Sequence, residues 1–276
     1  MRRRPSLANV GGLCSALLLV LFTVGEAAAQ DPATPPGNAR PTVTWQLSAG
    51  VESFSFRDIA KSRPPVDGSP LRWRGSGPVV TIAYDRARPF RLHRFDLTVS
   101  SNGGFVYDTG IDVTPRPDGD SATFVASRYD YRRYLRRRLL MNGLQAGIGV
   151  RGVGERRGLH HHYAGGVVLS ETGVTGTIAY IAALRFRRSD RLGLELEVAD
   201  GATLAHGVQR HTDVVATDAS FGGGWLTQWA AHADVRVTRR SALQVTYRHD
   251  GEGLLFDHRS YATGRQLLMV GLTYAR

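Results

Sequence analysis

Apolar and polar residues alternate over long stretches of this chain, and this period of two constrains the fold more than any other feature. Successive side chains of a β-strand point to opposite faces, so each stretch predicts a strand with one apolar face and one polar face. Residues 129–140, rich in Tyr and Arg, are interpreted as two strands joined by a turn. The predicted apolar faces are Trp45, Leu47, Ala49 and Val51; Val80, Ile82 and Tyr84; Phe95, Leu97 and Val99; Leu144, Ala146, Ile148 and Val150; Ile178, Tyr180, Ala182, Leu184 and Phe186; Leu192, Leu194, Leu196 and Val198; Trp225, Trp229, Ala231, Ala233, Val235 and Val237; Leu243, Val245 and Tyr247; and Leu268, Val270, Leu272 and Tyr274.

The connections between these segments alternate between short and long. The predicted short turns are Arg86–Leu92, Leu135–Arg138, Arg188–Asp190 and Thr238–Ser241. The predicted long loops are Arg57–Ser76, Asp108–Ser121, Gly152–Thr175, Gly201–Gly222 and Gly251–Gly264. Interleaved in this way they join about ten antiparallel strands, with eight or twelve as alternatives. An even number of strands, with loops that are long on one side only, is typical of transmembrane β-barrels.

Aromatic residues gather at both ends of the apolar faces. Trp45, Tyr84, Phe95, Phe186 and Tyr274 lie toward the short turns, whereas Phe105, Tyr107 and Trp225 lie toward the long loops. Two aromatic belts are expected where a barrel meets the two surfaces of a membrane. A soluble β-sandwich is the alternative, but it needs neither the belts nor the one-sided loops. The sequence therefore predicts an all-β fold, a transmembrane antiparallel β-barrel.

The N-terminus has the three parts of a secretory signal peptide. Basic residues Arg2–Arg4 precede an apolar run over Val10–Val24, and Ala27–Ala29 provides a cleavage site. The expected organisation is a cleaved signal at residues 1–29, a short N-terminal segment at 30–41, and the barrel at 42–276. Cys14 is the only cysteine, so the mature chain would have neither a disulfide nor thiol chemistry.

The charge of the chain is strongly positive, and this raises the question of nucleic-acid binding. The formal net charge is +11, carried almost wholly by arginine because Lys61 is the only lysine. The basic residues lie in turns, in loops and at alternate strand positions instead of forming one patch or tail, which does not fit a nucleic-acid footprint. We expect no nucleic-acid partner and no cofactor.

With these features together, the chain resembles the small outer-membrane β-barrel proteins of bacteria. The last segment is similar to their C-terminal assembly signal, because Leu268, Val270, Leu272 and Tyr274 alternate and end on an aromatic residue. Ala275 and Arg276 follow, where many members of the family end on the aromatic. The resemblance implies a location in the bacterial outer membrane, with membrane lipid and the barrel-assembly machinery as partners. It does not predict an external ligand.

Alternation also predicts which charged residues point into the barrel. The inward acids are Glu52, Asp85, Asp96, Asp130, Glu195, Glu197 and Asp234, and the inward arginines are Arg94, Arg128, Arg132, Arg151, Arg185, Arg187, Arg236 and Arg248. A ten-stranded barrel is only slightly wider than the eight-stranded kind, whose interior is filled by side chains. Arginine and carboxylate pairs would therefore close the lumen. The predicted function is non-enzymatic, either structural or loop-mediated binding, with a narrow channel as one alternative.

The other alternative is an outer-membrane hydrolase. In ten-stranded omptin proteases acidic residues and an Asp–His pair lie above the membrane. Here Asp108, Asp112, His211 and Asp213 have the matching residue types in external loops, although the local motifs differ.

A second comparison is with the lipid A deacylases. Tyr247–Gly251 resembles their His-x-Ser stretch, but Gly251 stands at the nucleophile position. His258 and Ser260 keep the His-x-Ser spacing within a loop. Ser–His catalysis needs a base within hydrogen-bond reach and an orienting third group, and the sequence shows no complete set. It therefore predicts no catalytic residues.

Two groups of histidines could have other roles. His160–His162 could bind a metal. Three consecutive residues of an extended chain alternate between its two sides, so an exposed polar loop is the preferred interpretation and no metal site is predicted. His232 and Asp234 share the lumen face, and we expect them to pair.

Overall fold

A computed structural model describes residues 42–60, 72–107, 121–135, 144–162, 168–187, 191–212, 218–255 and 259–276. The expected signal peptide at 1–29 and the segment at 30–41 lie outside these residues. The strands are β1 (Thr42–Ala60), β2 (Arg72–Arg88), β3 (Arg91–Tyr107), β4 (Ser121–Tyr134), β5 (Leu144–His162), β6 (Val168–Arg187), β7 (Leu192–Thr212), β8 (Asp218–Arg236), β9 (Ser241–Leu255) and β10 (Arg259–Ala275). The described residues contain no helix that is long and apolar enough to cross a membrane.

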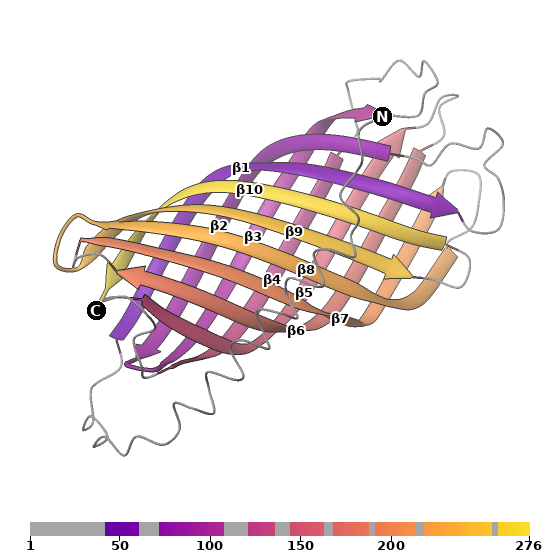
Figure 1. Cartoon of the computed structure of the whole chain (residues 1–276). Helices are drawn as coiled ribbons and strands as arrows, with labels where there is room; N and C mark the ends of the chain where they lie inside the picture. The colour runs from indigo at the N-terminus through magenta and orange to yellow at the C-terminus, as the bar shows by residue number, and fades with distance from the viewer. Residues whose placement is uncertain are drawn as a thin grey trace, which may run out of the picture.

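The ten strands form one closed antiparallel barrel. Each strand pairs with its neighbours in the sequence, and β1 pairs with β10 to close the ring, as Figure 1 shows. Closure leaves no sheet edge, so every strand has a backbone partner on both sides. The predicted fold class and the preferred strand number are both confirmed.

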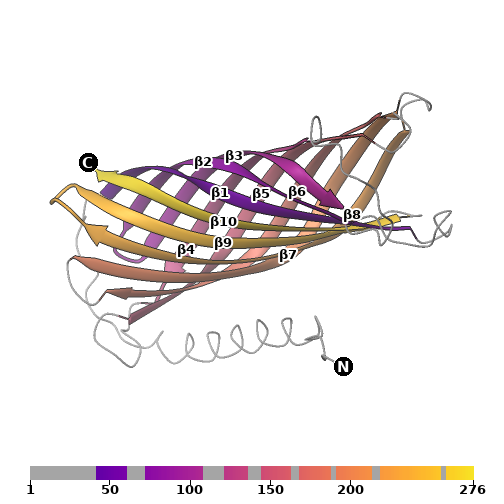
Figure 2. The same cartoon turned by 90° about the horizontal axis from the view of Figure 1, so that it is seen from above.

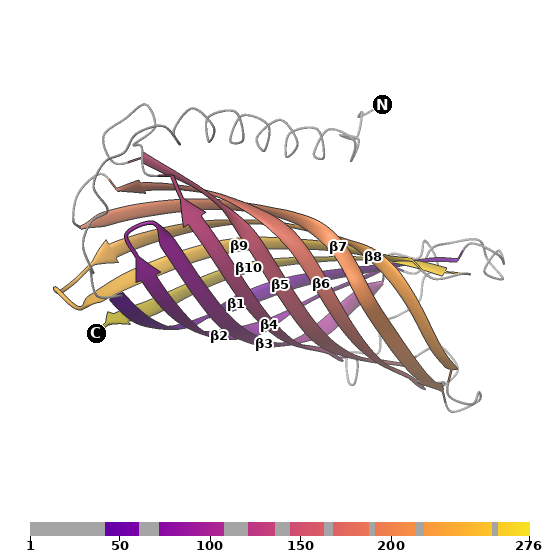
Figure 3. The ribbon, with the colours of Figure 1, turned by 90° about the horizontal axis from the view of Figure 1, so that it is seen from below.

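The register of the strands fixes the tilt of the barrel. Followed from strand to strand, the partners of Trp45 lead through Tyr84 and Phe95 around the ring and return to β1 at Arg57, twelve residues beyond the start at position 45. Such a stagger requires strands inclined to the barrel axis, typically by about 35–45°. Figures 2 and 3 show this inclination from opposite sides.

The two faces of the wall follow the predicted alternation. On β7, Leu194 and Leu196 lie on the outer surface, whereas Glu195 and Glu197 are buried in the lumen. The aromatic residues predicted at the short-turn end also lie on the outer surface, with Trp45 and Tyr84 in contact at 4.9 Å between ring centroids. The outer surface is therefore an apolar band, and the polar residues fill the interior.

The turns match the prediction better than the loops do. Between β2 and β3 only Pro89 and Phe90 form the turn, and the predicted turn Thr238–Ser241 lies where expected between β8 and β9. The predicted turn Arg188–Asp190 and most of the predicted turn Leu135–Arg138 lie outside the described residues. The predicted long loops are wrong in extent, because β5 continues to His162, β7 to Thr212 and β9 to Leu255. Beyond the bilayer both faces of a strand meet polar surroundings, so these extensions lack the apolar alternation that marks a membrane strand.

Candidate functional site: the charged lumen

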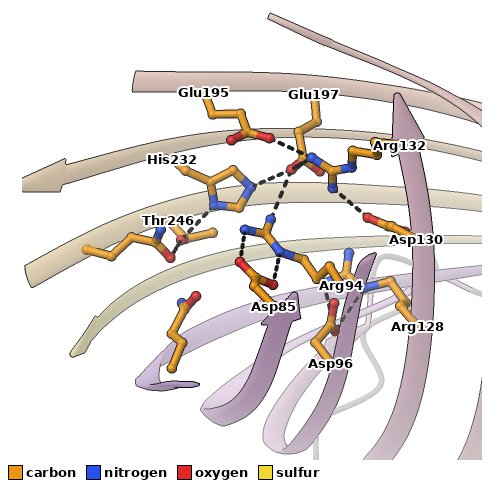
Figure 4. Close-up of polar contacts among 12 residues, drawn as sticks. Asp85, Arg94, Asp96, Arg128, Asp130, Arg132, Glu195, Glu197, His232 and Thr246 are labelled. Atoms are coloured by element: carbon orange, nitrogen blue, oxygen red, sulfur yellow. Dashed lines mark hydrogen bonds and ion pairs between the residues drawn. The ribbon is translucent and has the colours of Figure 1, made fainter. Parts of the chain in front are cut away.

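The centre of the lumen holds a network of arginines and carboxylates from opposite walls. Arg132 of β4 lies 2.6 Å from Glu195 and 2.6 Å from Glu197, both on β7, and also pairs with Asp130. Arg132 is fully buried and Glu197 is 3% exposed. Buried charges are costly unless they are paired and hydrogen-bonded, so these residues stabilise the barrel only as a set. Figure 4 shows Asp130, Glu195 and Glu197 around the Arg132 guanidinium.

Two further arginines extend this network across the barrel. Arg94 of β3 donates to both carboxylate oxygens of Asp85, at 2.8 and 2.9 Å, and reaches Glu197 at 3.2 Å. Arg151 of β5 donates to Asp130 at 2.7 Å, to Glu197 at 2.9 Å and to Gln228 of β8 at 3.0 Å. The planar guanidinium can hold several acceptors at once, so each arginine ties together strands that are not neighbours in the sheet.

The network ends in neutral partners on either side. Arg185 bonds Glu195 at 2.8 Å and stacks over the Tyr134 ring at 4.6 Å. His232 lies 3.3 Å from Glu197 and forms a hydrogen bond with the hydroxyl of Thr246 at 2.9 Å. The expected pairing of His232 with Asp234 is wrong, because the imidazole lies against Glu197 of the adjacent strand β7 instead. We call this set the central network; it consists of Asp85, Arg94, Asp130, Arg132, Tyr134, Arg151, Arg185, Glu195, Glu197, Gln228, His232 and Thr246.

The space around the central network is small. On its periplasmic side, a vestibule of about 220 Å³ is lined by Thr42 at the start of β1, by Ala275 at the end of β10, and by Arg239 and Arg240 of the last short turn. Within the network, a cavity of about 30 Å³ lies between Arg94, Arg151 and other residues. That volume holds roughly one or two water molecules. The vestibule is thus an open mouth that narrows sharply at the charged residues.

A second charged group, which we call the outer cluster, lies further toward the external end. Arg265 of β10 pairs with Glu52 of β1 at 2.8 Å and with Glu155 of β5 at 2.6 Å. Asn102 of β3 donates to the other oxygen of Glu52 at 2.9 Å. Glu155 lies four residues beyond Arg151 along β5, which places the cluster outside the central network. The lumen therefore contains two successive layers of paired charge.

Aromatic rings support the outer cluster. The Arg265 guanidinium lies 4.4 Å from the centroid of the Phe124 ring, and Phe124 packs against Phe54 at 4.8 Å. Both phenylalanines are buried inside the barrel. A cation over an aromatic face is attracted by the ring quadrupole, most strongly where water is excluded. The rings fill the cross-section between the charged side chains.

The sequence analysis found Glu52 but missed the rest of the outer cluster. Glu155 and Arg157 fell within the predicted loop 152–175, and Glu252 fell within the predicted loop 251–264. All three belong to strand extensions, and Arg157 and Glu252 are buried. The sequence carried no usable signal for Glu155 and Arg157, because both faces of β5 are polar there. Of the predicted inward arginines, the Arg187 side chain lies outside the described residues, and Arg236 lines the vestibule as an exposed residue.

The structure leaves one hydrolase hypothesis untested and does not assemble the other. Asp108, Asp112 and Asp213 lie outside the described residues, and for His211 only the backbone, near the end of β7, is described. In Tyr247–Gly251, by contrast, Asp250 is buried in the lumen beside Arg248, whereas His249 lies against Trp229 on the outer surface. The side chains of these two consecutive residues therefore lie on opposite faces of the barrel wall. His258 and the Ser260 side chain also lie outside the described part.

Most of the histidine run lies outside the described side chains, so the expectation for it stays untested. His160 pairs with Ser121 in the β4–β5 register, and the side chains of His161 and His162 are outside the described set. Among the residues that the structure describes, no group of three or more His, Cys, Asp or Glu side chains could hold a metal ion.

Solved structures similar to this barrel come from bacterial outer membranes. The outer membrane protease OmpT from Escherichia coli superposes with a TM-score of 0.58 at 10% sequence identity, over 87% of this chain and 99% of that chain. Ail, the attachment invasion locus protein of Yersinia pestis, gives a TM-score of 0.33 at 10% identity, over 86% and 100% of the two chains. Neisserial surface protein A gives 0.33 at 11% identity, over 83% and 96%.

The likeness to OmpT shows the class of fold and nothing narrower. The chain has the fold of the small outer-membrane β-barrels. Of the three superpositions, the one with the protease OmpT has the highest TM-score. No family model matches the sequence, and no curated protein is similar to it in sequence. Fold alone does not fix function, so the role has to be derived from the lumen and the surface.

Proposed function

We propose that this protein is a closed, non-enzymatic barrel of the bacterial outer membrane, with a structural or loop-mediated binding role. The central network carries the proposal, since it joins residues of β2 to β9 across the lumen. An open pore would keep its charged residues lining a water-filled channel. Here Arg132 and Glu197 are instead buried and paired with each other. Charged side chains that would face ions in an open channel instead pair with one another across the lumen and stabilise the barrel.

Planar-bilayer recordings test the closed lumen directly. The wild-type barrel is expected to show little or no steady conductance, because the cavity at the central network is only about 30 Å³. Replacing Glu195 and Glu197 together by alanine removes two of the three carboxylates that pair with Arg132 and is expected to give a leak current and a lower thermal stability. A large, stable conductance in the wild-type protein would contradict the proposal and favour the alternative of a channel.

The location is tested by cell fractionation and gel mobility. The apolar outer surface, with Leu47, Ile82 and Leu272 exposed, is expected to place the protein in the outer-membrane fraction. Because a closed barrel resists unfolding by detergent, boiled and unboiled samples are expected to migrate differently. Recovery as a soluble periplasmic monomer with one mobility is the result that would overturn the location.

The hydrolase alternative rests on the residue types of Asp108, Asp112, His211 and Asp213, because the likeness to OmpT at 10% identity extends to the fold alone. The proposed partners remain membrane lipid and the barrel-assembly machinery. If the purified protein had a protease or esterase activity, and substitutions in the external loops abolished it, the non-enzymatic proposal would be wrong.

A further inference from the structure

The outer surface of the β2–β3 hairpin holds a cluster of arginines at the periplasmic end of the barrel. Arg86, Arg88 and Arg91, together with Tyr84 and His93, line a shallow cavity of about 360 Å³. Alternation places all five on the outside of the wall, because Leu92 between them is buried in the interior. We call these five residues the hairpin patch.

The positive charge of the hairpin patch is not balanced by any residue that the structure describes. In the described part of the chain, Arg86, Arg88 and Arg91 form no ion pair. The neighbouring acid, Asp85, points into the lumen, where Arg94 binds both of its oxygens. On the next strand, Arg133 lies directly opposite Arg91. Like charges opposite each other are destabilising, so the patch is set up to bind an anion.

The depth of the patch identifies the kind of anion. Tyr84 contacts Trp45 in the aromatic belt, and His93 is hydrogen-bonded to the Tyr129 hydroxyl at 2.8 Å. Such belts lie at the level of the lipid headgroups. Arg86 and Arg88 follow two and four residues closer to the periplasm than Tyr84, and their long side chains can extend back to the headgroup level, where the lipid phosphates lie.

We propose that the hairpin patch binds the phosphodiester group of an anionic phospholipid in the periplasmic leaflet. Arginine suits this ligand because its fork donates two parallel hydrogen bonds to phosphate oxygens. The Tyr84 ring and the apolar band above it contact the glycerol and the first acyl carbons, which a free phosphate ion lacks. The inference rests on the proposed membrane location but not on the closed lumen.

Native mass spectrometry of the purified full-length barrel, offered phosphatidylglycerol or phosphatidylcholine, tests this proposal. The wild-type protein is expected to retain phosphatidylglycerol preferentially. Arg86→Gln, Arg88→Gln and Arg91→Gln together are expected to weaken that retention about 100-fold, because each basic residue near a lipid surface contributes about fivefold. The matched control, Arg191→Gln, Arg239→Gln and Arg240→Gln, removes the same charge at the same end and is expected to weaken retention by less than about fivefold.

Additional variants and controls distinguish a bound lipid from a free phosphate ion, and a wrong proposal from an unfolded protein. The three hairpin arginines changed to lysine keep the charge without the fork, so retention is expected to fall between that of the wild type and that of the glutamine variant. Equal losses in the hairpin and control variants would show general charge attraction and overturn the proposal, as would displacement of the lipid by millimolar inorganic phosphate. Heat-modifiable gel mobility verifies that each variant is folded. If the wild type also lacked it, the proposed location itself would fail.

Discussion

Replacing Glu197 by alanine is expected to destabilise the folded barrel by about 3–5 kcal/mol, the typical cost of removing one partner from a buried ion pair. This single carboxylate lies 2.6 Å from Arg132, 2.9 Å from Arg151 and 3.2 Å from Arg94. Its loss leaves buried guanidinium groups with fewer acceptors. The free energy of unfolding can be measured by urea titration of the protein folded into lipid vesicles.

Two controls make the Glu197 experiment specific. Asp200→Ala removes an acid from the same strand, but Asp200 is exposed and accepts only a hydrogen bond from Thr227. Its effect is expected within about 0.5 kcal/mol. Adding Arg132→Ala to Glu197→Ala leaves the remaining acids paired, since Glu195 keeps Arg185 and Asp130 keeps Arg151. The double variant is therefore expected to lose less stability than the sum of the single variants. Additive losses would show that the two residues are not coupled.

Val270→Arg is expected to cost about 2–4 kcal/mol, the penalty for a charge on the lipid face near the middle of the bilayer. Val270 is exposed on the outer surface and lies four residues beyond Tyr274 of the periplasmic belt. Its register partner Ala49 is likewise four residues beyond Trp45. Both strands therefore place this position well inside the apolar band.

A depth series tests the prediction for Val270. Leu194 also faces lipid, but it lies opposite Phe186 of the periplasmic belt, only two residues from the start of β7. Leu194→Arg is therefore expected to cost about 0–1 kcal/mol. Folding free energies in vesicles should rank the two variants in this order. An equal penalty at both positions would mean that the assigned membrane level is wrong.

The lipid-facing half of the wall could be predicted from the sequence because lipid imposes a simple rule. Every second residue of a membrane strand must be apolar, and Leu194 and Leu196 obey this rule while Glu195 and Glu197 do not. The same rule fails above the bilayer. Around Glu155 and Arg157 both faces of β5 are polar, so the pattern there could not distinguish a strand from a loop.

The partners inside the lumen could not be predicted from alternation alone. Alternation gives the face of a residue, but its height depends on strand tilt and on the stagger around the ring. His232 and Asp234 share a face of β8, but the partner of His232 is on another strand. Glu197 reaches His232 from the adjacent strand β7, and Arg94 reaches Glu197 from the far wall. Such contacts follow only once the register of every strand is known.

The outer cluster also has a bearing on how the ring is completed during assembly. Arg265 belongs to the last strand to be synthesised, while Glu52 belongs to the first and Glu155 to the middle of the chain. An intermediate with β1 and β10 still apart leaves the Arg265 cation without the Glu52 carboxylate. Pairing of β1 with β10 thus neutralises a buried cation and also forms a row of backbone hydrogen bonds. The ion pair between Arg265 and Glu52 therefore forms only when β1 and β10 pair in the correct register.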